Sequence, residues 1–372
     1  MSNRLLSLVA VLALAVMLSP SAYSKGAKHK GSGPSWMGDA DTTLLFNTDA
    51  GQTATSPNNI QARYAYHLGV WGDYDWLDYM VELGSNASAS DPHTVFGMGP
   101  AVPGLALSRA KMTVHVMDTL FLDFGRFDNP LAVEGWNFFW DPDYKTTGWG
   151  QRVEVGNFFL NVVEHLHTTS IGSATVALGS NFGGGATILF GGNMGYTWEW
   201  TDSLTALTTL NVFDVNSNTQ VGANVSLNWE NKEGYPVMLG VGGYLPVGTK
   251  GAGTTLAGLL RLQYGDLSVD DSYMLAWSLA YIGDDSFIQS SGPVAGADFP
   301  SVWANERLTR VSGALLTGGA LTSTVIDVGI DAFYRFHSWF ELGLLLDYGT
   351  SSKTTLADTS FIYAELVART KF

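Results

Sequence analysis

The chain has 372 residues, a formal net charge of −15, 14% charged residues, 12% aromatic residues and no cysteine. Without cysteine it cannot be a disulfide-stapled scaffold, and its acidity argues against binding nucleic acid, which requires a basic face. Low charge combined with 43 glycines and many aromatic residues favours a sheet with two unlike faces, one of them apolar.

The N-terminus has the pattern of a secretory signal peptide. Arg4 precedes an apolar run from Leu5 to Leu18, and Ala22-Tyr23-Ser24 supplies small residues at the two positions that a signal peptidase reads. We therefore expect residues 1–24 to be removed near Ser24, the alternative being an uncleaved N-terminal anchor. No other window approaches the ~20 apolar residues that a membrane helix needs, so any crossing of a membrane must use strands.

Strands are predicted from about residue 41 onward. A short periplasmic lead at 25–40, too small for an energy-transducing plug, precedes a first strand at 41–48. Apolar and polar residues then alternate along several segments, clearest in the ranges 61–70, 106–116, 221–230 and 326–337. Alternation over ~10 residues between turns is typical of a transmembrane β-barrel. A soluble β-sandwich also alternates, but such domains are smaller and have surfaces richer in charge.

The connections alternate between short and long. The short ones are predicted at Asp73-Tyr74, Met117-Asp118, Gly156-Asn157, 201–203, 231–234, 265–271 and 337–339. The long ones are predicted at 49–60, 85–103, 127–148, 168–185, 214–218, 246–253, 284–324 and 351–360. Bacterial barrels have short periplasmic turns, long outer loops and an even strand number. Residues 41–372 are therefore predicted to form a transmembrane antiparallel β-barrel of sixteen strands, with eighteen as the alternative if 168–185 or 284–324 contains further strands.

Aromatic residues gather at the predicted periplasmic ends of the strands. They are Trp76, Trp200, Trp229, Tyr235, Tyr264, Tyr273, Phe336 and Phe372. Amphipathic rings form such belts where the hydrocarbon meets the headgroups. Scatter by β-propensity alone would not collect them at one end.

The closing strand is the segment from Ile362 to Phe372. Its apolar face includes Ile362 and Leu366, and its polar face includes Glu365, Arg369 and Lys371. An amphipathic strand that ends in Phe resembles the closing strand of bacterial outer-membrane barrels, which implies recognition of Phe372 by the barrel assembly machinery. In such strands a second aromatic often stands two residues before the last, where this chain has Thr370.

Residues 107–163 contain a distinctive series of motifs: Gly125-Arg126, Asn129-Pro130, the segment from Trp140 to Asp143 and the Gly148-led strand that follows. In this series the segment resembles the proteobacterial outer-membrane porin family, of the general-diffusion type. This resemblance implies a sixteen-stranded diffusion porin of a Gram-negative outer membrane, in contact with lipid and lipopolysaccharide and assembled as a homotrimer. It also implies passage of ions and small hydrophilic solutes, without enzymatic activity or a cofactor.

Pore-lining residues follow from the alternation. The candidates for a basic wall are Arg63, Arg109, Lys111 and Arg152, and further inner-face charges include Asp123, Glu154 and Arg369. The loop at 127–148, with Asp141 and Asp143, is predicted to fold inward and face that wall. Charged rings of this kind set the selectivity of pores. The alternatives are charges that simply pair with cross-strand neighbours, and an outer loop held by its own aromatics.

The acid excess predicts a modest cation preference. The His165/His167 pair has a spacing that metal sites use, but we expect rim or lumen histidines there. Asp141-Pro142-Asp143 lacks the ligand series of a calcium loop, and no catalytic serine motif is present. A plugged structural or adhesive barrel and an outer-membrane barrel hydrolase stay open as other functions.

Overall fold

The computed structural model describes residues 34–49, 59–84, 94–95, 106–128, 131, 145–167, 187–215, 218–230, 235–247, 256–283, 316–317, 320–321, 323–353 and 359–371. Within these ranges the chain forms one large antiparallel sheet and one tiny two-stranded sheet. The long strands are β1 (Ser35–Asp49), β2 (Asn59–Tyr74), β3 (Leu77–Gly84), β5 (Ala106–Met117), β6 (Leu120–Asp128), β7 (Lys145–Val155), β8 (Phe158–His167), β9 (Thr187–Thr201), β10 (Leu204–Val215), β11 (Asn218–Glu230), β12 (Pro236–Val247), β13 (Ala257–Gly265), β14 (Ser272–Ile282), β17 (Ser323–His337), β18 (Phe340–Lys353) and β19 (Thr359–Lys371).

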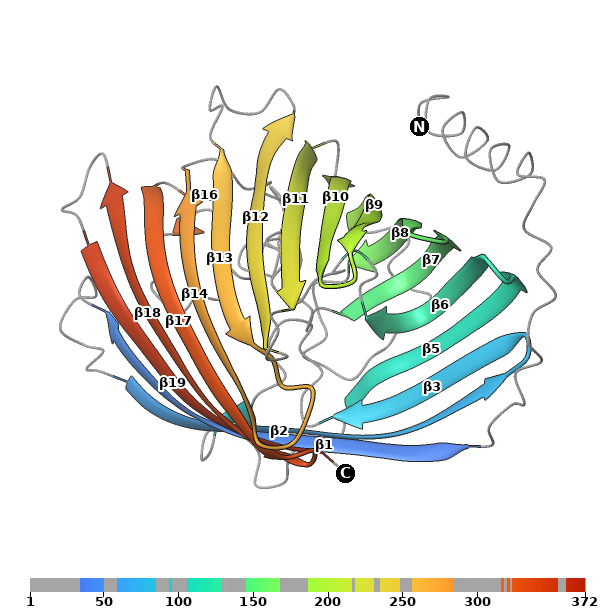
Figure 1. Ribbon diagram of the computed structural model, residues 1–372, viewed down its shortest axis with the longest axis horizontal. Helices are drawn as coiled ribbons and strands as arrows, with labels where there is room; N and C mark the ends of the chain where they lie inside the picture. Colours follow the sequence, from blue (N-terminus) through green and yellow to red (C-terminus); the bar gives the residue numbers. More distant parts are fainter. Residues whose placement is uncertain are drawn as a thin grey trace.

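The large sheet closes on itself. Each long strand pairs with its neighbours in chain order, and β1 pairs both with β2, from Ser35↔Trp71, and with β19, from Asp39↔Lys371. Figure 1 shows the strands succeeding one another round a single wall, with β1 and β19 meeting at the seam. Closure leaves no unpaired sheet edge, which is the condition for a sheet to stand in hydrocarbon.

The predicted number of sixteen strands is confirmed. The large sheet also contains β4 (Thr94–Val95), but this two-residue piece pairs with β2 at Arg63 and Tyr64 and does not cross the wall. In the predicted loop 284–324, β15 (Leu316–Thr317) and β16 (Ala320–Leu321) pair only with each other. The first strand begins at Ser35, earlier than the predicted residue 41, because its pairing with β2 continues to Trp71.

The predicted short connections lie at one end of the wall, whereas the connection from β10 to β11, predicted as a long loop at 214–218, spans only residues 216–217 at the other end. Two-residue turns join β2 to β3, β5 to β6, β7 to β8, β9 to β10 and β17 to β18. The first of them is Asp75-Trp76, two residues later than the predicted Asp73-Tyr74. The connection from β13 to β14, at 266–271, is the predicted longer turn. Most of the long connections lie outside the described residues. The end of each strand at the short turns is called its turn-side end, and the opposite end is called its loop-side end.

The barrel has its polar side chains inside and its apolar side chains outside. Along β19, Leu366 is 46% exposed whereas its neighbour Glu365 is 5% exposed. The buried polar side chains include five aspartates and glutamates on β17, β18 and β19, while Leu, Val, Trp and Tyr dominate the exposed large residues. A water-soluble fold buries its apolar residues, so this inverted distribution indicates lipid outside and water inside.

The aromatic belt is confirmed for its described members. Tyr235, Tyr264 and Tyr273 contact one another at the turn-side ends of β12, β13 and β14, with ring centroids 5.5–5.9 Å apart. Trp76 and Trp200 are more than half exposed, and Phe372 lies outside the described residues. Among the residues that the structure describes, no helix is both long and apolar enough to span a membrane.

Candidate functional site: the inner wall of the barrel

Strand register decides which charged side chains meet on the inner wall. On β5, Arg109, Lys111 and Thr113 alternate with outward residues and stand opposite Glu82, Met80 and Asp78 of β3. On the other side β5 pairs with β6, where Thr113 stands opposite Asp123. On β5, Arg109 and Thr113 therefore each stand opposite a carboxylate of β3. Thr113 also stands opposite Asp123 of β6.

Asp123 is the centre of a charged cluster. Its side chain is 1% exposed and lies 3.3 Å from the Lys111 ammonium and 2.7 Å from Arg152 Nε. The Thr113 hydroxyl donates to the same carboxylate at 2.6 Å. One buried carboxylate is thus shared by two cations, Lys111 from β5 and Arg152 from β7, and the 2.7 Å bond to Arg152 belongs to the strong, charge-assisted class.

Arg152 is held in place by further contacts. Its guanidinium carbon lies 5.1 Å from the centre of the Phe121 ring, a cation–π distance. Glu154 lies 3.4 Å away on the same strand and is 53% exposed. Because Glu154 is largely hydrated, its pairing with Arg152 is screened and weak, whereas the pairing with Asp123 is sheltered.

Arg109 forms a second cluster nearer the loop side. It lies 3.1 Å from Glu82, which is 1% exposed, and 3.1 Å from Asp128. The described members of the predicted basic wall, Arg109, Lys111 and Arg152, are therefore each paired with a neighbouring carboxylate. An opposing acidic loop at Asp141 and Asp143 stays a prediction, because both residues lie outside the described ranges.

The remaining predicted pore residues lie where the alternation places them, as far as they are described. Arg369 stands over the inner-wall ring of Phe333, 5.2 Å from its centre. Arg63 pairs through its backbone with Thr43 and Val95, but its side chain lies outside the described part of the chain. The side chains of His165 and His167, the predicted rim pair, also lie outside the described part of the chain.

The wall formed by β13 to β19 is rich in acids. Arg261 lies 2.8 Å from Asp331, and both side chains are nearly buried. Arg335 Nε donates to Glu341 at 2.9 Å, and Tyr363 donates to Glu365. Asp327 and Asp347 are buried on the same inner face. In Figure 1 these strands stand across the barrel from β5, β6 and β7.

Between these charged sectors the wall carries amides. Asn161, Asn193 and Asn211 stand opposite one another on β8, β9 and β10. The Asn161 amide donates to Asn193 at 2.9 Å, and all three side chains are buried. These residues are polar without charge, so the wall changes character round its circumference.

Leu131, in the connection from β6 to β7, lies against this amide row. Asn193 Nδ2 donates to the backbone carbonyl of Leu131 at 3.1 Å, and Leu131 is 1% exposed. Phe127, the last inward residue of β6, is equally buried. Leu131 is the one residue described between β6 and β7, within the predicted loop 127–148, and it lies inside the barrel.

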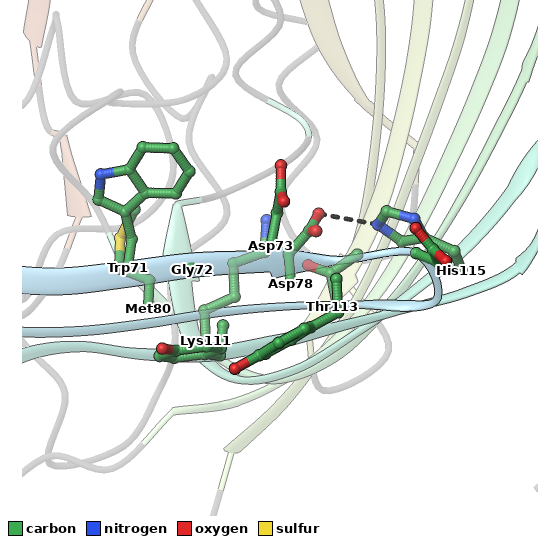
Figure 2. Close-up of a pocket in the computed structure, with 11 residues that line it drawn as sticks. Trp71, Gly72, Asp73, Asp78, Met80, Lys111, Thr113 and His115 are labelled. Carbon is green, nitrogen blue, oxygen red and sulfur yellow. Dashed lines mark hydrogen bonds and ion pairs between the residues drawn. The ribbon is translucent and has the colours of Figure 1, made fainter. Parts of the chain in front are cut away.

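A hollow of about 370 Å³ adjoins the Asp123 cluster on its turn side. Figure 2 shows Trp71, Asp73 and Asp78 projecting from β2 and β3, with His115 of β5 paired to Asp78 at 2.8 Å. Neither Trp71 nor His115 is among the predicted pore-lining candidates. Extending the alternation of β2 beyond Val70 would have placed Trp71 on the inner wall. Across the described residues, no group of three or more histidines, aspartates or glutamates could hold a metal ion.

Comparisons with known proteins bear on the fold. No protein-family model and no curated protein matches the chain. Among solved structures, OprB of Pseudomonas putida is similar with 12% identity and a TM-score of 0.62 over 91% of this chain and 94% of its own. OmpT of Vibrio cholerae, an outer-membrane protein in a trimer form, is 11% identical with a TM-score of 0.50 over 92% and 99%. The outer-membrane channel DcaP of Acinetobacter baumannii is 10% identical with a TM-score of 0.50 over 93% and 99%. The fold is that of outer-membrane β-barrels.

Proposed function

We propose that this chain is an outer-membrane diffusion channel for ions and small hydrophilic solutes. The observation that carries the proposal is the closed wall with charged and amide side chains inside and apolar side chains outside. A wall of this kind offers dissolved ions a hydrated path through hydrocarbon. DcaP, a similar structure, is described as an outer-membrane channel.

A modest cation preference is part of the proposal. The described inner wall carries Asp78, Glu82, Asp123, Glu154, Asp327, Asp331, Glu341, Asp347 and Glu365 against Arg109, Lys111, Arg152, Arg261, Arg335 and Arg369. Carboxylates therefore outnumber cations along the path. A wall with excess negative charge favours cations at low salt, and the preference weakens as salt screens the field.

The loop at 127–148 is proposed to narrow the pore. The bond from Asn193 to the Leu131 carbonyl supports this, since it ties the start of the loop to the inner wall. Asp141 and Asp143 would then enter the lumen and face the Asp123 cluster. Replacing Asn193 by Ala removes two buried hydrogen bonds, to the Leu131 carbonyl and from Asn161, each of about 1 kcal/mol, so we expect larger or noisier single-channel steps. Ser278→Ala, which alters a buried hydroxyl of β14, is the control and should leave the steps unchanged.

The location and assembly of the channel are proposed from the sequence. Residues 1–24 would direct export, and residues 25–40 would form the periplasmic lead and the start of β1. The short turns would face the periplasm, lipid and lipopolysaccharide would surround the outer face, and Phe372 would be read by the assembly machinery. A homotrimer is supported by the trimer form of OmpT.

Conductance measured in planar bilayers tests the function. Refolded protein should give stable open steps, and a tenfold salt gradient should give a reversal potential of the cation-selective sign. Correctly folded protein without conductance would favour a plugged structural or adhesive barrel. Hydrolysis of lipid or peptide substrates by the same preparation would favour a barrel hydrolase. Anion selectivity would refute the ion preference while leaving the channel intact.

A further inference from the structure

On the part of the outer face that the structure describes, long polar side chains gather on β6, β7 and β8. Register places Arg126 of β6 opposite outward Ala110, and Gln151 of β7 opposite Leu122 and Val162. Glu164 of β8 stands opposite Trp149, whose indole donates to its carboxylate at 2.8 Å. Arg126, Gln151, Trp149 and Glu164, on three consecutive strands, are named here the β7 patch.

The depth of this patch can be worked out from the strands. A strand tilted by about 40° climbs about 2.6 Å per residue along the barrel axis. Arg126 and Glu164 are each six residues from the turn-side ends of their strands, at Leu120 and Phe158, which places them about 16 Å up the wall. Gln151 is four residues from Val155 and stands at about 10 Å.

These heights fall inside the hydrocarbon. The lipid-facing band of such barrels is about 25 Å tall and begins at the aromatic belt. Asp214, by contrast, lies ten residues above Leu204 on β10 and reaches about 26 Å, the level of the headgroups. Up to the height of Glu164, the charged outer-face side chains that the structure describes are Arg126 and Glu164.

Contact with hydrocarbon is energetically unfavourable for the polar side chains of this patch. An amide or a charge against hydrocarbon loses its hydrogen bonds to water without replacement. A long Arg side chain can reach up toward the headgroups, and Arg126 Nε does reach the Ser108 carbonyl at 2.8 Å. Gln151 lies deeper in the hydrocarbon and has a shorter side chain, and the Glu164 carboxylate accepts its hydrogen bond from Trp149. Neither side chain therefore reaches the lipid headgroups.

Resting on the proposed place of the barrel in the membrane, we infer that the β7 patch is a contact surface for a second copy of this chain. Arg126 and Glu164 lie on either side of β7 and carry opposite charges. In a closed assembly with β7 nearest the symmetry axis, Arg126 of one copy faces Glu164 of the next, and Gln151 lies between copies instead of against lipid. Closed symmetry of this kind satisfies every such pair at once, and the exclusion of water strengthens it.

Charge reversal tests the contact. Arg126→Glu and Glu164→Arg are made singly and together, and the oligomer is measured by native mass spectrometry in mild detergent. Each single variant should lose at least tenfold in oligomer population, and the double variant should recover most of it. Asp214→Arg, a charge reversal on the outer face at headgroup level, is the matched control and should keep the oligomer. Equal oligomer populations in all four variants would overturn the inference.

Cross-linking gives an independent measurement, since the chain has no cysteine of its own. Gln151→Cys should form a disulfide-linked dimer on oxidation in proteoliposomes, whereas Leu210→Cys, 58% exposed on the outer face of β10, should not. A monomeric wild-type chain, or cross-linking only through Leu210→Cys, would place lipid or glycolipid on the patch and sink the inference. Conductance of the same samples is read in parallel, because a conducting monomer would reject the contact and leave the proposed channel standing.

Discussion

Neutralising Asp123 should shift the ion preference of the channel toward anions. The Asp123→Asn change keeps the shape of the side chain and its bond with Thr113, but leaves Lys111 and Arg152 without their shared buried counter-charge. Both cations are about a quarter to a third exposed, so they meet permeating ions directly. The change therefore acts on selectivity more than on folding.

The size of the shift follows from elementary electrostatics. A unit charge about 6 Å from the ion path, in water at about 0.1 M salt, changes the energy of an ion by about 0.4 kcal/mol after screening. The change has opposite signs for a cation and an anion, so the permeability ratio moves by about 0.8 kcal/mol, or roughly fourfold. At about 1 M salt the shift should nearly vanish, since the screening length falls to about 3 Å.

The assay is the reversal potential in a KCl gradient across a planar bilayer, with Glu154→Gln as the matched control. Both substitutions remove one negative charge that contacts Arg152, but Glu154 is 53% exposed and Asp123 is 1% exposed. We expect a clear shift for Asp123→Asn and a small one for Glu154→Gln. Equal shifts would mean that only total charge matters, and an unchanged Asp123→Asn channel would refute the role of the cluster.

Two further predictions concern stability, measured by urea unfolding in lipid vesicles. Gly125 has φ +102° and a Cβ there would lie 2.1 Å from the Ala110 carbonyl oxygen, so Gly125→Ala should prevent folding or cost more than about 2 kcal/mol. Gly156→Ala, at φ +57° with open space around it, should cost only about 1 kcal/mol, and equal effects would contradict the clash. Arg261→Ala should cost about 3 kcal/mol by leaving Asp331 buried and charged, whereas Arg261→Met with Asp331→Leu should restore most of it; an additive double variant would argue against a coupled pair.

Much of the fold was predictable because a barrel repeats one rule. Alternation with a period of two fixes the face of each residue, and turn residues fix where the strands reverse. The side assigned to Glu365 and Leu366 was therefore right without any knowledge of the neighbouring strands. The start of β1 was misplaced because 35–40 lacks regular alternation, and its strand conformation comes from pairing with β2.

The charged clusters were only half predictable. Alternation placed Lys111, Asp123 and Arg152 on the inner wall, but it says nothing of relative height, which depends on the register between β5, β6 and β7. Leu131 gave no signal, since an apolar loop residue looks the same whether it turns inward or outward. The β7 patch did leave one, because Gln151 and Glu164 interrupt an otherwise apolar face.

The seam between β1 and β19 bears on how the barrel can form. The Thr370 hydroxyl donates to the Ala40 carbonyl at 3.0 Å, joining residues 330 positions apart, at the place where similar strands often carry a ring. Contacts of such sequence separation form late, because the entropy of closing the intervening chain must be overcome first. Until then both edges of the sheet are bare and prone to pair with other chains. A hydroxyl residue that bonds directly to the first strand should shorten that period, so we expect Thr370→Val to slow the closure of the barrel.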